Sequence, residues 1–86
     1  ARRRQPLEAF PLDAMAMVGS LDRSGELVAL VRVDRLLYQV RPGNYLGQND
    51  GRVTSVNENR IELVELVPDG AGGWLERPAS LALNEQ

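Results

Sequence analysis

The sequence predicts an all-β fold, a small β-sandwich or barrel of six or seven short antiparallel strands. One observation is the length, because 86 residues suffice for one domain with a thin core of two layers. A second is that apolar residues occur in short runs with strand-like patterning. A third is that turn-forming residues separate these runs at regular intervals. We expect residues 1–6 to be the disordered end of a linker and residues 7–86 to form the domain.

Residues 7–15 precede the first predicted strand. Pro11 excludes a long helix there, yet Leu7, Phe10 and Leu12 are too apolar to remain in water. We therefore expect a short turn or a single helical turn that plugs one open end of the β-structure. Phe10 should be buried.

The first strand is predicted over residues 15–21. Its apolar residues recur at period two, so one face should carry Met15, Met17, Gly19 and Leu21. A glycine inside a strand often marks a bulge or a close backbone approach, and we expect one of these at Gly19. Residues 22–26 then form a hairpin loop.

The next two strands are predicted over residues 27–33 and 36–40. The first of them is nearly apolar on both faces, which is typical of a central strand. Asp34 and Arg35 form the tight reversal between them. Because a two-residue hairpin usually contains Asn-Gly or Asp-Gly, the sequence leaves the register of this hairpin open.

Residues 41–53 contain three glycines and a proline, which predict a folded loop. Gly43, Gly47 and Gly51 are interpreted as structural, because glycine adopts positive φ at no steric cost. Within this loop, Tyr45 and Leu46 are the residues that we expect to anchor it to the core.

The rest of the chain predicts strands over residues 52–56 and 60–67, a short strand or edge over 74–76 and a closing strand over 79–83. Residues 57–59 form a turn, and residues 68–73 form an exposed glycine-rich loop.

Two features of these strands predict irregular pairing. Ile61 and Leu63 occupy one phase of their strand, whereas Val64 and Leu66 occupy the other. This switch predicts a bulge or a strand that passes between two sheets. Pro78 cannot donate a backbone hydrogen bond, so we expect it to interrupt pairing.

The sequence contains no histidine and no cysteine. The usual general base, the usual nucleophile pairs and most transition-metal sites are therefore missing. Glu62 and Glu65 fall in opposite phases of one strand and make a poor carboxylate pair. We predict a non-enzymatic protein with no catalytic residues, no cofactor and no metal site.

One alternative function comes from glycine spacing. Leu46-Gly47 followed by Gly51-Arg52-Val53 is similar to the KOW pattern of SH3-like barrels that bind RNA or a transcription or translation partner. Such modules usually carry a basic face. Here residues 44–86 hold three arginines against seven acidic residues, which opposes binding to a phosphate backbone. We keep this as the alternative and expect no nucleic-acid partner.

Several segments between residues 7 and 83 carry a resemblance to a known family. They are Leu7-Glu8-x-Phe10-Pro11-Leu12, Met17-Val18-Gly19-x-Leu21, Ala29-Leu30-Val31, Val40-x-x-Gly43-Asn44-Tyr45-Leu46-Gly47-Gln48-Asn49-x-Gly51, Ile61-Glu62-Leu63-x-Glu65 and Pro68-Asp69-Gly70-x-Gly72-Gly73-Trp74-x-Glu76-Arg77-Pro78-Ala79. Together they resemble the C-terminal periplasmic domain of PilP, the inner-membrane lipoprotein of the type IV pilus machine. The turn at Asp34-Arg35 departs from the family pattern, which implies a longer, glycine-containing hairpin.

The resemblance implies a two-sheet β-sandwich related to the homology region of the type II secretion protein GspC. It also implies a periplasmic location, tethered to the inner membrane. Because the chain begins without Met, we expect a fragment whose lipid-anchored N-terminus and linker lie upstream and bind the PilN–PilO pair. The folded domain is expected to contact the periplasmic domains of the outer-membrane secretin PilQ.

The expected contact surface is the first strand with the charged residues beside it, because exposed strands are places where a partner can dock. It comprises Met17, Val18, Gly19, Ser20, Leu21, Arg23, Arg32 and Arg35. The arginines are expected to pair with acidic partner residues. We interpret Trp74 and Tyr45 as core or loop-anchor residues rather than binding platforms.

Overall fold

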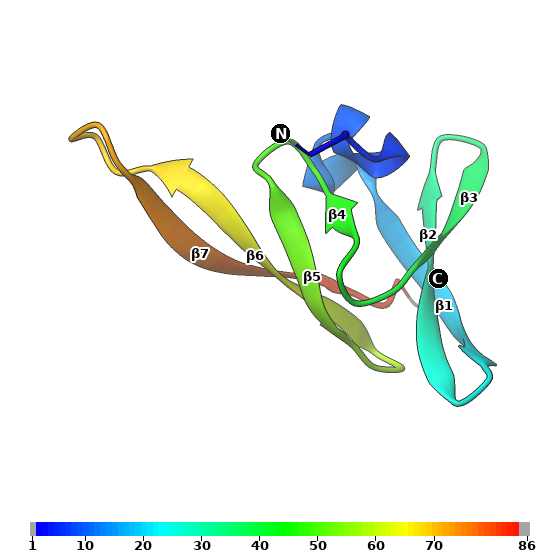
Figure 1. Ribbon diagram of the computed structural model, residues 1–86. Helices are drawn as coiled ribbons and strands as arrows, with labels where there is room; N and C mark the ends of the chain where they lie inside the picture. The colour runs from blue at the N-terminus through cyan, green and yellow to red at the C-terminus, as the bar shows by residue number, and fades with distance from the viewer. Residues whose placement is uncertain (1, 85–86) are drawn as a thin grey trace.

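The computed structural model describes residues 2–84, and these form two antiparallel sheets (Figure 1). Sheet A contains, in spatial order, β1 (Ala16–Arg23), β2 (Glu26–Val33) and β3 (Leu36–Val40). Sheet B contains β4 (Tyr45–Leu46), β5 (Gly51–Val56), β6 (Arg60–Pro68) and β7 (Trp74–Ala82) in the same way. Two short 3-10 helices, η1 (Pro6–Ala9) and η2 (Leu12–Ala14), precede β1. The predicted all-β, two-sheet fold is confirmed.

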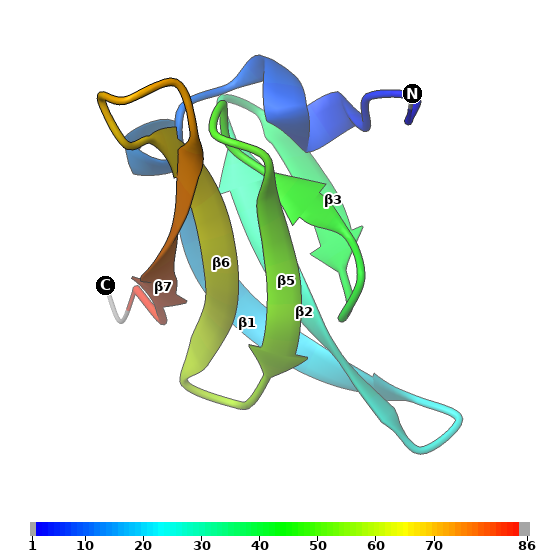
Figure 2. The same ribbon diagram turned by 60° about the vertical axis from the view of Figure 1, so that its left-hand side comes forward.

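The two sheets pack against each other and are joined along one side (Figure 2). There the amide of Asn84 donates to the carbonyl of Met17 at 2.8 Å, and Met17 forms a parallel bridge with Leu83. On the other side, β3 and β4 follow each other in the chain but do not pair. The sandwich therefore has a seam between β3 and β4.

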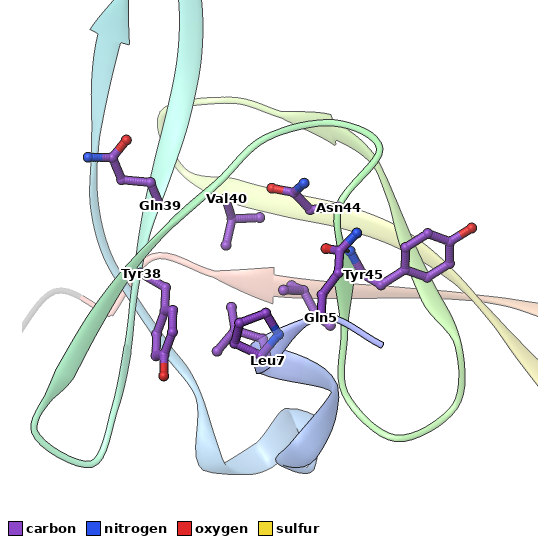
Figure 3. A pocket seen from close by; sticks show the side chains of 9 residues that line it. Gln5, Leu7, Tyr38, Gln39, Val40, Asn44 and Tyr45 are labelled. Atoms are coloured by element: carbon purple, nitrogen blue, oxygen red, sulfur yellow. Dashed lines mark hydrogen bonds between the residues drawn. The ribbon is translucent and has the colours of Figure 1, made fainter. Parts of the chain in front are cut away.

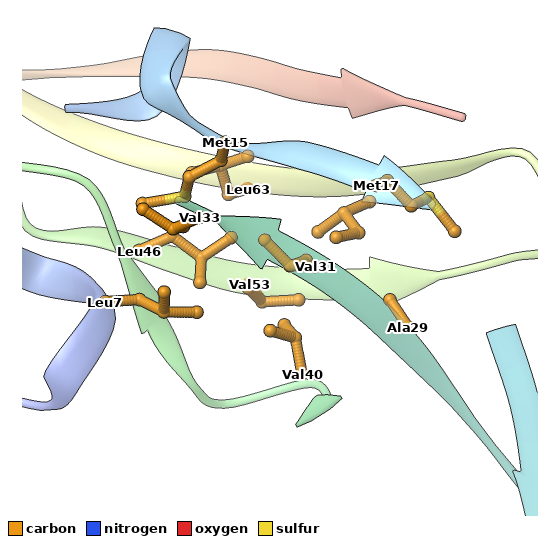
Figure 4. Close-up of a cluster of buried hydrophobic side chains, with 11 residues drawn as sticks. Leu7, Met15, Met17, Ala29, Val31, Val33, Val40, Leu46, Val53 and Leu63 are labelled. Carbon is orange, nitrogen blue, oxygen red and sulfur yellow. The ribbon is translucent and has the colours of Figure 1, made fainter. Parts of the chain in front are cut away.

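The hydrophobic core lies between the sheets (Figure 4). Alternate residues of the long strands point inward, as expected from the period of two in a strand. The fully buried side chains of this cluster include Met17, Val31, Val33, Val40, Leu46, Val53, Ile61 and Leu63. Both sheets contribute, so the core depends on their mutual packing.

The bulge predicted in the first strand is confirmed, and it corrects the predicted face. The register of β1 against β2 shifts between Met17, which pairs with Val31, and Gly19, which pairs with Leu30. The extra residue reverses the phase of the strand. Gly19 and Leu21 therefore lie on the outer face of sheet A, opposite to Met17.

The bulge or change of sheet predicted for residues 60–67 is wrong for that strand. Strand β6 pairs with β7 without a shift, and the bulge is in β5, between Val53 and Ser55. Val64 and Leu66 simply face outward. Pro78 also remains in register, opposite Val64, because β7 is an edge strand and a proline nitrogen on an edge can face away from the sheet.

The N-terminal segment forms two short helical turns, close to the predicted turn or single helical turn, and it packs beside the seam. Leu7 in η1 is buried, and its carbonyl accepts a hydrogen bond from the amide of Gly47 at 3.1 Å. Phe10 is only partly buried and packs on the margin of the core, so its predicted burial is wrong in degree. No helix among the described residues has the length and apolarity needed to cross a membrane.

Candidate protein-interaction surfaces

The outer face of sheet A brings together part of the predicted contact surface. Leu21 pairs with Val28 and Gly19 with Leu30, so these residues share that face. Arg23 and Arg32 lie on the same face by their register positions. The register therefore places partly exposed apolar side chains beside two arginines, and we name Leu21, Leu30, Leu37, Arg23 and Arg32 the sheet A face.

Electrostatics of the sheet A face are set by exposed guanidinium groups. Arg23 donates a hydrogen bond to the amide oxygen of Gln39 at 2.7 Å, which holds its side chain across β2 toward β3. Arg32 is exposed opposite Leu37, itself 59% exposed. Glu26 lies opposite Arg23 on this face, but its carboxylate pairs with Arg41. The two exposed arginines are therefore left, among the described residues, as the free cations of the face, which suits an acidic protein partner.

Other predicted contact residues take different positions. Met17 is fully buried, and its carbonyl is already bonded to Asn84, so it supports β1 from beneath and cannot line a contact surface. Val18 occupies the bulge, and Ser20 lies on the inner side of sheet A, opposite Ala29. Arg35 is in the turn at the other end of β2 from Arg23 and is not part of the same patch.

A groove of about 280 Å³ opens at the seam between β3 and β4 (Figure 3). Leu7, Val40 and Leu46 give it an apolar floor. Neutral polar side chains and Tyr38 complete the lining, which consists of Gln5, Pro6, Leu7, Tyr38, Gln39, Val40, Asn44, Tyr45 and Leu46. Sequence reasoning missed this groove, because it forms between segments whose proximity depends on how the sheets close.

An arginine cluster fixes the N-terminal segment beside this groove. Arg2 forms a bidentate ion pair with Glu8, with distances of 2.7 and 2.9 Å, and a second ion pair with Asp50 at 3.0 Å. Its guanidinium carbon lies 3.4 Å from the centre of the Tyr45 ring. Gln5 adds a hydrogen bond that its side-chain oxygen accepts from the Tyr45 amide. Arg2, Arg4 and Gln5 thus make specific contacts, which differs from the disordered linker end expected over residues 1–6. Residue 1 lies outside the described residues.

Glu8 is the electrostatic centre of this cluster. The hydrogen bonds from Arg2 hold the pKa of Glu8 well below its usual range, at about 2, against the opposing effect of burial. The amide of Gln5 also donates to this carboxylate, at 2.7 Å. Because every buried charge here has a partner, the cluster fastens η1 to the loop that precedes β5.

The comparisons with known proteins identify the family. A family profile described as "Pilus assembly protein, PilP" matches residues 1–83. The chain belongs to the PilP family. The fold and the family expected from the sequence are therefore both confirmed, and the KOW-like alternative is replaced.

Individual relatives agree. The type IV pilus inner membrane component PilP of Pseudomonas aeruginosa is 46% identical over 85 residues, which are 99% of this chain but 49% of that protein. This PilP-family chain thus spans about half the length of that curated relative.

Solved structures of relatives show the same fold. A domain of the type IV pilus biogenesis lipoprotein PilP from Pseudomonas aeruginosa matches with a TM-score of 0.89 and 46% identity, over 96% of this chain and 95% of that chain. A domain of the Neisseria meningitidis PilP pilot protein matches with a TM-score of 0.77 and 40% identity, over 96% and 74% of the two chains.

The glycine loop that contributed to the PilP resemblance has the expected positive φ at only two of its three glycines. Gly43 and Gly47 have positive φ values of 93° and 77°, which side chains rarely adopt. Gly51 has no such conformation, but a Cβ atom there would lie 2.7 Å from the carbonyl oxygen of Leu46. Leu46 is fully buried and anchors the loop, whereas Tyr45 is half-buried and holds Arg2.

The prediction for one residue of the second PilP segment, residues 68–79, is wrong. Trp74 was expected in the core or as a loop anchor, but it is 66% exposed on β7. The turn beside it is instead held by Asp69, whose carboxylate accepts hydrogen bonds from the amides of Ala71 and Gly73 at 2.7 and 2.9 Å. The tryptophan is thus available at the surface.

Proposed function

We propose that this domain is a non-enzymatic periplasmic scaffold of the type IV pilus assembly machine. In this proposal it links the inner-membrane PilN–PilO pair to the outer-membrane secretin PilQ, and the folded domain contacts the secretin. The lipid anchor and the segment that binds PilN–PilO belong to sequence beyond these 86 residues. No nucleic acid is among the proposed partners.

The sheet A face is the observation that carries this proposal. It offers apolar side chains between arginines on one side of a PilP-family domain, in the manner of a small, partly polar interface. Its arginines favour an acidic partner surface, because opposite charges accelerate association and oppose wrong partners. The proposed contact residues are Gly19 and the sheet A face (Leu21, Leu30, Leu37, Arg23 and Arg32), which replace the larger set expected from the sequence.

The proposal is tested by titrating the ¹⁵N-labelled domain with the purified N-terminal periplasmic domains of the secretin. We expect chemical-shift changes over the sheet A face. The double variant Arg23→Glu, Arg32→Glu should raise the Kd at least about tenfold, the equivalent of ~1.4 kcal/mol. Arg52→Glu, which changes an exposed arginine in sheet B, is the matched control and should bind as the parent does. Absence of shifts at near-millimolar secretin would refute the contact.

A further inference from the structure

The outer face of the β6–β7 hairpin carries an apolar stripe. Residues paired across two antiparallel strands lie on the same face, and the pairs here are Val64 with Pro78, Leu66 with Glu76 and Pro68 with Trp74. We name the five apolar members of these pairs the arm stripe. Leu66 is 37% and Trp74 66% exposed. Val64 and Leu66 are the apolar residues of β6 that alternate with buried Ile61 and Leu63, and they face away from the core.

The stripe begins at Val64 and Pro78, in the body of sheet B, and continues along an arm that extends beyond the rest of the sheet (Figure 1). The pairing of β5 with β6 ends at Arg52 and Val64, whereas β6 and β7 continue together to Pro68 and Trp74. The last link to the body of the sheet is the hydrogen bond from the Leu66 amide to the Asn49 carbonyl, at 2.9 Å. The tip is thus a two-stranded ribbon.

This ribbon ends in an ordered turn. Besides the two amides that its carboxylate accepts from, Asp69 donates its own amide to the carbonyl of Gly73 at 3.1 Å. These backbone hydrogen bonds lower the pKa of Asp69, so the carboxylate stays ionised and keeps the turn closed. Trp74 follows this turn directly. A large aromatic side chain on a pre-ordered ribbon loses little conformational entropy on binding, which is the usual property of an interface anchor.

The size and charge of the arm indicate what covers it. A stable dimer interface takes about 20–30 residues on each side, far more than five side chains supply, so two arms alone do not explain the stripe. Glu76 lies within the stripe and forms no ion pair among the described residues, since neighbouring Arg77 is bonded to Glu65 at 2.9 Å. Together with Asp69 it makes the arm acidic, which opposes docking on an anionic lipid surface.

We propose that the arm stripe docks into an apolar cleft of a folded domain of the pilus assembly machine, with a cationic side chain of that domain opposite Glu76. A projecting ribbon is convex, so its receptor must be concave to bury Trp74 and Leu66 together. The inference goes beyond the function proposed above, because the arm belongs to sheet B and the face assigned to the secretin belongs to sheet A.

Trp74 is the only tryptophan of the chain, so its fluorescence reports on the arm alone. The purified domain is titrated with the soluble periplasmic pair of PilN and PilO and, separately, with the secretin N-terminal domains, each in a variant without tryptophan. We expect one of these probes to shift the Trp74 emission to shorter wavelength and to reduce its quenching by acrylamide. Leu66→Ser and Glu76→Arg should each raise the Kd of that complex at least about tenfold.

The matched control is Leu36→Ser, which removes an exposed leucine of β3 that lies outside the sheet A face and should leave the Trp74 response unchanged. Far-ultraviolet circular dichroism establishes that all variants are folded. Unchanged Trp74 emission with both protein probes overturns the inference, even where the sheet A resonances shift and the secretin contact stands. A Trp74 response to vesicles of phosphatidylethanolamine and phosphatidylglycerol, or to the concentration of the domain alone, overturns it as well.

Discussion

Replacing Gly51 with alanine tests whether the glycine loop is shaped by lack of space. Gly51 is the first residue of β5, which lies between β4 and β6 in sheet B, and it is buried. An added Cβ would lie 2.6 Å from Leu63 Cδ1 and 2.7 Å from the carbonyl oxygen of Leu46. The leucine side chain can rotate, but the carbonyl belongs to the backbone of β4. Strand β4 is in turn fixed by the hydrogen bond from the Gly47 amide to Leu7, so the strain cannot be relieved locally.

The expected magnitude follows from two opposing effects. Overpacking of a buried site costs about 1–3 kcal/mol. Loss of glycine freedom in the unfolded chain returns about 0.4–1 kcal/mol. We therefore expect Gly51→Ala to lower the free energy of unfolding by about 1–2 kcal/mol, against a total of about 4–13 kcal/mol for a domain of this length.

Gly19→Ala is the matched control, because it is also a glycine in a strand. Its Cβ would meet only Leu30 Cδ1 at 3.7 Å, an ordinary contact, and its φ is not positive. Urea unfolding followed by far-ultraviolet circular dichroism measures both variants, since exposed Trp74 is a poor reporter of unfolding. With a slope of about 1 kcal/mol per molar urea, the midpoint of Gly51→Ala should fall by about 1–2 M. Equal midpoints for the two variants would refute the steric argument.

Two further predictions concern the charged groups. The pKa of Glu8 is lowered from 4.5 to about 2, so its ionised form stabilises the fold above about pH 4.5 and this contribution is lost as the pH falls toward 2. Glu8→Gln should therefore be less stable than the parent at pH 7 and show a flatter decline of the urea midpoint in acid, while Glu58→Gln in an exposed turn behaves as the parent does. Asp69→Ala should increase the hydrogen-exchange rate of the Gly73 amide several-fold and leave that of Val53 in the core unchanged, because only the arm turn loses its acceptor.

Local sequence patterns predicted most strands, because each strand buries alternate residues and ends at a turn. The hairpin at Asp34 and Arg35 is an example: the two residues form the turn, with Asp34 at a φ of 55°, although neither is a glycine. The β1 bulge was predicted from Gly19, but its consequence for the neighbouring residues was not. A bulge reverses the phase of everything that follows it, so Leu21 moved from the predicted inner face to the outer one.

Contacts between distant segments were beyond the reach of sequence patterns. The Arg2–Glu8–Asp50 cluster joins residues 48 positions apart, and nothing in an N-terminal run of arginines distinguishes the one that folds back from those that do not. The groove at the seam depends in the same way on β3 and β4 lying side by side without pairing. Arg23 and Arg32 are exposed, as the sequence predicted. Trp74 was predicted to be a core or loop-anchor residue, but its side chain is exposed.

The two apolar phases of β6 were predicted to mark a bulge or a change of sheet, but in the structure the second phase forms part of the outer surface. Periodicity reveals that a strand has two apolar phases, but it does not reveal that only one of them has a sheet to pack against. In a sandwich of two layers every strand has an inner and an outer face, so contiguous apolar residues on an outer face are candidates for contact with another protein. Both sheets carry apolar residues on their outer faces. They are Leu21 and Leu30 in sheet A and Leu66 and Trp74 on the arm. Because these surfaces belong to different sheets, we expect that occupation of one leaves the other accessible.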